Sequence, residues 1–160
     1  MLEGATWPLL SNVIRRNSLS NTFGYVRHYA NGTRKAHQGW DFTTEIGTIC
    51  YAVGDGKVEF VADQGDYGVQ LCMSFEAGGS TWYAFYAHLQ RASKAAGDLV
   101  EMNDQIATAG ISGNARRLPA ADYHLHFEIR TRAVCGLGLV NRVSPLRVFG
   151  ICPLNSPVAG

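Results

Sequence analysis

Several features that would mark a particular class of protein are missing from this sequence. Acidic and basic residues nearly balance, with a formal net charge of +1, and no block of Lys or Arg marks a surface for nucleic acid or an anionic membrane. No apolar run approaches the ~18 residues that span a bilayer. Glu3 stands near the start, where a signal peptide carries positive charge. We therefore expect no nucleic-acid partner, no membrane span and no signal peptide in this chain.

The cysteines also lack the spacing of a common site. None of the four forms a C-x-x-C pair, which argues against a structural zinc site built from cysteines. Cys50 and Cys72 lie in apolar runs typical of strands, so we expect buried and inert thiols. Cys135 and Cys152 bracket a segment with glycine and proline. A disulfide between them is plausible if the protein works outside the cytoplasm.

Short apolar runs separated by glycine turns indicate the fold class. The chain has 18 glycines in 160 residues, above the usual share of ~7%. Turn signals at 54–56 and 65–66 separate runs that read as antiparallel strands. We expect these strands at residues 48–53, 56–62, 67–75 and 81–89. The pattern predicts a mainly β protein, with one sheet face packed and the other available as the floor of a groove.

The length and the 46% hydrophobic content favour a single domain with a sizeable core. Within it we expect an N-terminal lead-in at residues 1–20, a catalytic core at 21–132, and a closing segment with a tail at 133–160. Apolar residues at helical spacing between Leu9 and Arg16 could form a helical turn or two, with a role in packing.

Four histidines and one aspartate stand in positions that suggest chemistry. Because side chains alternate along a strand, His124 and His126 project to the same side. His37 and Asp41 lie four residues apart on chain that we expect to be extended, so they also share a face. His88 ends the strand at 81–89, where alternation would place it on the side of Trp82, Ala84 and Tyr86. Each of these residues, taken alone, has an ordinary structural explanation.

Together these residues resemble the zinc metallopeptidases of the M23 family, the lysostaphin and LytM type of peptidoglycan endopeptidase. The likeness covers roughly residues 21–149 and includes motifs in the family's order. They are Phe23-Gly24-Tyr25 with Arg27, His37-Gln38-Gly39-Trp40-Asp41-Phe42 followed by Gly47-Thr48, Tyr86-Ala87-His88-Leu89, His124-Leu125-His126-Phe127-Glu128-Ile129-Arg130, and Ser144-Pro145-Leu146. Two short stretches depart from the family pattern, namely Asp104-Gln105 and Ala121-Asp122-Tyr123.

The resemblance implies a site and an architecture. It assigns one Zn²⁺ to His37, Asp41 and His126, which leaves an open position for water. It makes His88 and His124 the catalytic histidines, acting as general base and as hydrogen-bond donor. Tyr29 is a further candidate for an oxyanion or substrate contact. The expected fold is an antiparallel sheet that forms a groove, with a second small sheet (a barrel-sandwich hybrid) and few short helices.

The function implied by the resemblance is hydrolysis of peptide stems or cross-links of bacterial peptidoglycan, in the periplasm or the extracellular cell wall. The alternative is a non-catalytic relative that binds the wall or activates a partner hydrolase. A closed structural zinc site with four ligands is a third reading. The missing signal peptide suggests an antibacterial effector that is delivered by a secretion machine and paired with an immunity protein.

Overall fold

The computed structural model describes residues 1–160 and shows a mainly β protein, as the sequence predicts. One nine-stranded antiparallel sheet dominates, and two small two-stranded sheets flank it. The strands of the main sheet are β4 (Trp40–Thr43), β5 (Ile49–Tyr51), β6 (Gly56–Gln64), β7 (Gly68–Ala77), β8 (Ser80–Ala92), β9 (Leu99–Val100), β10 (Gln105–Ala109), β11 (His124–Arg130) and β12 (Arg142–Val143). The four strands expected between residues 48 and 89 are therefore present, with ends that differ by a few residues.

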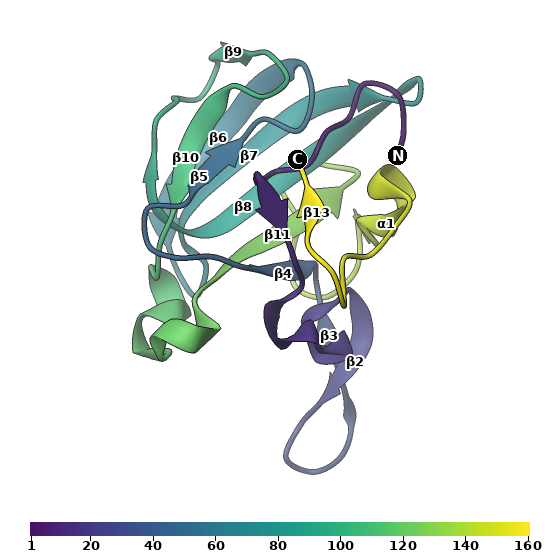
Figure 1. Ribbon diagram of the computed structural model, residues 1–160, viewed down its shortest axis with the longest axis vertical. Helices are drawn as coiled ribbons and strands as arrows, with labels where there is room; N and C mark the ends of the chain where they lie inside the picture. Colours follow the sequence, from purple (N-terminus) through teal and green to yellow (C-terminus); the bar gives the residue numbers. More distant parts are fainter.

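The long strands β6, β7 and β8 follow one another along the sheet, and β11 lies beside β8 (Figure 1). β11 is the junction of the site because it pairs with β8 on one edge and with β4 on the other. All seven residues of β11 are buried. Its outward face is therefore covered by other parts of the chain, and polar side chains on it must find partners inside the protein.

The core lies behind the strands that carry the histidines. Leu125, Phe127 and Ile129 of β11 belong to one large apolar cluster with Trp40 and Phe42 of β4. Phe127 contacts the rings of both Phe42 and Phe149, with centroids 6.0 Å and 5.8 Å apart. Alternation along β11 thus buries one face in the core and presents His124 and His126 on the other.

The two ends of the chain close the molecule on one side. β1 (Ser11–Asn12) pairs with β13 (Val158–Ala159), and α1 (Leu146–Phe149) precedes the tail. Leu9 and Ile14 of the lead-in are buried in the main core. The prediction of a helical turn between Leu9 and Arg16 is wrong, because Ser11 and Asn12 form strand β1 and a 3-10 helix starts only at Arg15.

The hairpin of β2 (Gly24–His28) and β3 (Arg34–His37) forms the other small sheet and projects from the body (Figure 1). The remaining 3-10 helices span Leu19–Asn21, Gly113–Arg117 and Ala120–Asp122. All four cysteines are free, with Cys50 and Cys72 buried, so no disulfide joins Cys135 to Cys152. No helix is both long enough and apolar enough to cross a bilayer.

Candidate metal centre and active site

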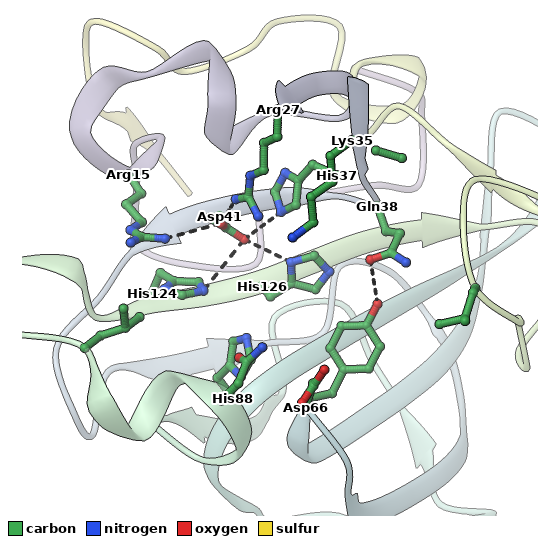
Figure 2. A pocket seen from close by; sticks show the side chains of 15 residues that line it. Arg15, Arg27, Lys35, His37, Gln38, Asp41, Asp66, His88, His124 and His126 are labelled. Atoms are coloured by element: carbon green, nitrogen blue, oxygen red, sulfur yellow. Dashed lines mark hydrogen bonds and ion pairs between the residues drawn. The ribbon is translucent and has the colours of Figure 1, made fainter. Parts of the chain in front are cut away.

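Three side chains from β3, β4 and β11 converge on one point. Asp41 of β4 is the cross-strand partner of His126 of β11, so the two side chains project from the same face. His126 Nδ1 lies 2.9 Å from Asp41 Oδ1, and His37 Nε2 lies 3.1 Å from the same oxygen. Ligand atoms around a tetrahedral zinc ion with bonds of about 2.0–2.1 Å are separated by roughly 3.3 Å. The spacing of the three atoms therefore fits a metal ion (Figure 2).

A glycine brings His37 to this point. The short link between β3 and β4 passes so close to β11 that a Cβ atom on Gly39 would lie 2.1 Å from the carbonyl oxygen of Phe127. Only glycine fits such an approach without moving the backbone. This close contact lets the chain pass from β3 to β4 directly beside β11, so that His37 and Asp41, four residues apart, face the same point.

Hydrogen bonds fix which nitrogen of each ligand candidate faces the cluster. His37 Nδ1–H donates to the carbonyl oxygen of Thr22 at 2.7 Å, which leaves the Nε2 lone pair toward Asp41. His126 Nε2–H donates to Glu128 Oε1 at 2.9 Å, which directs Nδ1 to Asp41. Such partners orient a metal-binding imidazole and raise its basicity.

The cluster favours positive charge at His126. Burial alone would lower the pKa of His126, but its hydrogen bonds to Asp41 and Glu128 raise that pKa to about 9. Burial would likewise raise the pKa of Asp41, yet the neighbouring histidines hold it well below its usual range. The carboxylates thus keep a proton on His126, and a metal cation at Nδ1 would take the place of that proton.

Glu128 is the centre of a buried ion-pair network behind His126. Its Oε2 accepts hydrogen bonds from Arg130 Nε at 2.6 Å and from Arg142 Nε at 2.7 Å. Tyr67 donates its hydroxyl to Glu128 Oε1 at 2.8 Å and stacks on the ring of His126. Glu128 itself has no exposed surface. The two guanidinium groups therefore keep the carboxylate of Glu128 directed at His126. Burial alone would raise the pKa of Glu128, but the hydrogen bond from His126 and the nearby positive charges hold that pKa below its usual range.

The second oxygen of Asp41 is also held. Arg27 donates to Asp41 Oδ2 at 2.8 Å, and Arg15 Nη1 lies 3.7 Å from it. Arg27 is fixed in turn by the carbonyl oxygen of Ser20 and by Asn21 Oδ1. This leaves Oδ1 as the oxygen directed at both histidines. One carboxylate oxygen is thus available to a metal ion while the other is anchored to the protein.

His88 reaches the same pocket through an irregularity in β8. The pairing of β7 with β8 shifts register between Leu71, opposite Tyr86, and Val69, opposite Leu89. At this bulge His88 has a left-handed backbone, with φ of 57°. The expectation that His88 lies on the side of Tyr86 is wrong, because the bulge turns its imidazole out of the core and into the pocket.

His88 and His124 share one tautomer. His88 Nδ1–H donates to the carbonyl oxygen of Ser112 at 2.9 Å, and His124 Nδ1–H donates to that of Asp122 at 2.9 Å. Both Nε2 atoms are thereby free to act in the pocket, and that of His124 lies 3.8 Å from Asp41 Oδ1. Burial, together with the nearby His124 and His126, lowers the pKa of His88 to about 4, and burial lowers that of His124 as well. The pair is neutral at pH 7.

The pocket has a volume of about 580 Å³ and contains all five residues that the sequence singles out as ligands or catalytic groups. Tyr29 is not among its lining residues and is 54% exposed just beyond β2. Arg15, Lys35 and Tyr67 do line it, and sequence reasoning missed them as site residues. Lys35 could have been found from its place two residues before His37 in the same strand, whereas Tyr67 and Arg15 carry no local signal.

Residues 35–135, which include every ligand candidate, match Peptidase family M23. The chain belongs to this family. Among curated proteins, it is 36% identical over 106 residues to the peptidoglycan DD-endopeptidase ShyB of Vibrio cholerae, and 32% identical over 110 residues to ShyC of the same organism. These matches cover 66% and 67% of this chain but only 23% of each relative. The M23 region is thus a minor part of those longer proteins.

Solved structures of similar proteins share the fold. A zinc containing peptidase from Vibrio cholerae superposes with a TM-score of 0.62 at 30% identity, over 84% of this chain and 41% of that one. LytU superposes with a TM-score of 0.62 at 28% identity, over 79% of both chains. A coverage of 84% is more of the chain than residues 35–135, so the structural likeness extends beyond the region that matches the family model.

Proposed function

We propose that this M23 protein is a zinc-dependent endopeptidase that hydrolyses peptide stems or cross-links of bacterial peptidoglycan. The family and the printed activities of ShyB and ShyC support this substrate class. The proposed place of action is the periplasm or the extracellular cell wall, where the substrate is found. The pairing with an immunity protein stays a prediction from the sequence.

The observation that carries the proposal is the convergence of His37 Nε2, Asp41 Oδ1 and His126 Nδ1, each oriented by a second hydrogen-bond partner. Two imidazoles and one carboxylate form a donor set typical of catalytic zinc sites. A zinc ion held by them would act as a Lewis acid, polarising the scissile carbonyl and lowering the pKa of water.

His88 and His124 supply the proton transfers in this proposal. Both are neutral at pH 7 and present Nε2 lone pairs in the pocket. One Nε2 accepts a proton from the attacking water, and an imidazolium formed in this way becomes a donor to the leaving amine. The second histidine stays neutral, and its Nε2 lone pair accepts a hydrogen bond from the attacking water or from the scissile N–H. Their rings are 5.0 Å apart, so one substrate group can contact both.

The non-catalytic alternative is less well supported. A binding module would need neither three oriented ligand atoms nor two further histidines held in one tautomer beside them. A closed structural site would need a fourth protein ligand on the cluster. The nearest candidate is His124, but its Nε2 lies 3.8 Å from Asp41 Oδ1, a longer distance than those from the ligand atoms of His37 and His126 to the same oxygen. The arrangement favours an open site.

Hydrolysis of purified peptidoglycan, followed by mass spectrometry of the released fragments, tests the proposal. We expect cleavage of peptide bonds, loss of cleavage after treatment with a chelator, and recovery when zinc is added back. Cleavage that persists after complete metal removal would contradict the metallopeptidase assignment. Binding to the wall without any released peptide would favour the non-catalytic alternative.

A further inference from the structure

Two cations are placed side by side on the hairpin that forms one wall of the pocket. Lys35 lies two residues before His37 on β3, so alternation directs both side chains to the same face. Across the hairpin, Lys35 is the register partner of Arg27 on β2. Like charges directly opposite each other destabilise an antiparallel pair. The carboxylate of Asp41 offsets the charge of Arg27 but leaves that of Lys35 without a partner.

The two cations differ in their partners. Arg27 makes three hydrogen bonds, to Ser20, Asn21 and Asp41. Lys35 takes part in none of the ion pairs and none of the side-chain hydrogen bonds of the structure. In Figure 2 its side chain extends from β3 into the pocket, toward the ligand candidates. Of the three Lys and Arg residues that line the pocket, Lys35 alone has no ion-pair partner in the protein.

We propose that Lys35 is a specificity-determining residue that binds a carboxylate of the substrate beside the scissile bond. This inference rests on the proposed function and deepens it. The ammonium group offers three donors and a full charge on a flexible stem. A metal ion on Asp41 would neutralise part of the negative charge that now balances Arg27. The positive potential around Lys35 would then rise, and its attraction for an anion would become stronger.

The proposal separates two classes of peptidoglycan cross-link by their chemistry. A diamino acid with a second carboxyl group places a free carboxylate on the carbon next to the scissile nitrogen. A lysine-type cross-link or a glycine bridge has no carboxylate at that place. Lys35 would therefore favour cross-links through a diamino dicarboxylic acid.

Tyr29 is given a different role by the same geometry. Lys35 Nζ lies 5.4 Å from the centroid of the Tyr29 ring, within the range of a cation–π contact. The ring, and not the hydroxyl, makes this contact. We infer that Tyr29 holds the ammonium group of Lys35 at the edge of the pocket as a positioning residue, so Tyr29→Phe should keep substrate preference and Tyr29→Ala should reduce it.

A pair of cross-linked muropeptide dimers tests the proposal. The two differ in one group only, a free carboxylate or a carboxamide on the carbon beside the scissile nitrogen. For the metal-loaded wild-type protein we expect a higher kcat/KM on the carboxylate. Lys35→Gln should lower kcat/KM on the carboxylate substrate about 10- to 100-fold, the range of one charge-assisted hydrogen bond, and should change the carboxamide reaction by less than about threefold. Lys35→Arg should keep the preference.

Arg34→Gln is the matched control. It removes one charge from the same strand, on an exposed residue that does not line the pocket, and should leave both reactions unchanged. Zinc content, measured for every variant, shows whether a lower rate reflects lost metal. Equal losses on both substrates for Lys35→Gln would overturn the inference and leave the proposed function standing. If the wild-type protein cleaves neither dimer nor whole peptidoglycan, the proposed function fails and the inference falls with it.

Discussion

His126 and Glu128 lie two residues apart on the same face of β11, and His126 Nε2–H donates to Glu128 Oε1 at 2.9 Å. The same carboxylate is bound by Arg130 and Arg142, so its position is fixed from behind. Alternation along one strand therefore supplies the ligand candidate and the group that orients it. The ion pairs that hold Glu128 extend to β12, beyond the end of the region that matches the family.

Replacing Glu128 should weaken metal binding through His126. We expect Glu128→Gln to lower zinc affinity about 10- to 100-fold, because the charge that raises the basicity of His126 is lost. The variant should also unfold more easily, by about 3–5 kcal/mol, since two buried guanidinium groups lose their counter-ion. Competition with a zinc-binding dye measures the affinity. The exposed Glu45→Gln serves as a control, and an unchanged affinity in Glu128→Gln would show that the hydrogen bond does not tune the ligand.

Substitutions in the five site residues should divide into two groups. His37→Ala, Asp41→Ala and His126→Ala should lose zinc and activity together. His124→Ala and His88→Asn should keep zinc and lose about 10²–10⁴ in rate. Asparagine is chosen at His88 because it tolerates the positive φ of this residue better than alanine. Elemental analysis of the purified variants checks the division, and zinc loss in the His124 variant but not in the His126 variant would reverse the roles.

The sequence predicts the strands because they depend on short-range periodicity, whereas the grouping of His37 and Asp41 with His126 rests on the resemblance to the M23 family. Alternation places His124 and His126 together, and the expected extended chain places His37 near Asp41. The same rule fails at His88, where one extra residue in β8 reverses the side on which the histidine projects. A bulge of this kind depends on pairing with β7, and the residues of β8 alone give no sign of it.

Contacts between distant segments were not predictable from local patterns. Arg15 reaches the pocket because the lead-in packs across the ends of β4 and β11, with an isolated bridge from Ile14 to Phe42. Arg142 reaches Glu128 only after the chain has left β11 and returned as β12. Both arginines find their partners through the packing of the whole fold, which short motifs do not encode.

Gly39 should tolerate no side chain. A Cβ atom there would lie 2.1 Å from the carbonyl oxygen of Phe127, so Gly39→Ala must push the link between β3 and β4 away from β11. We expect a loss of stability of at least about 1–3 kcal/mol and a weaker metal site, since His37 moves with this link. Denaturant unfolding and zinc titration measure the two effects. Gly136→Ala is the control, because open space surrounds that position and its φ is not positive; equal stability of the two variants would contradict this account of Gly39.

The ion pair between the lead-in and Asp122 should give the protein a pH-dependent stability in acid. The hydrogen bond from Arg16, with support from Arg15, lowers the pKa of Asp122 to about 2, against about 3.9 in an unfolded chain. A carboxylate with a lowered pKa in the folded state stabilises the protein fully above the unfolded pKa, and this contribution is lost as the pH falls through the folded pKa. The contribution of Asp122 should therefore be constant above about pH 5 and disappear between about pH 4 and pH 2.

The difference in Tm between the wild-type protein and Asp122→Asn, measured without metal at a series of pH values, isolates this contribution. Other carboxylates titrate in both proteins, so their effects cancel in the difference. The control is Asp63→Asn, which removes an exposed carboxylate without an ion pair or hydrogen bond and so matches the change in net charge. A Tm difference for Asp122→Asn that stays constant down to pH 2 would mean that the ion pair does not stabilise the fold. The apolar contacts of Leu9 and Ile14 would then contribute more to holding the lead-in in place than its ion pair with Asp122 does.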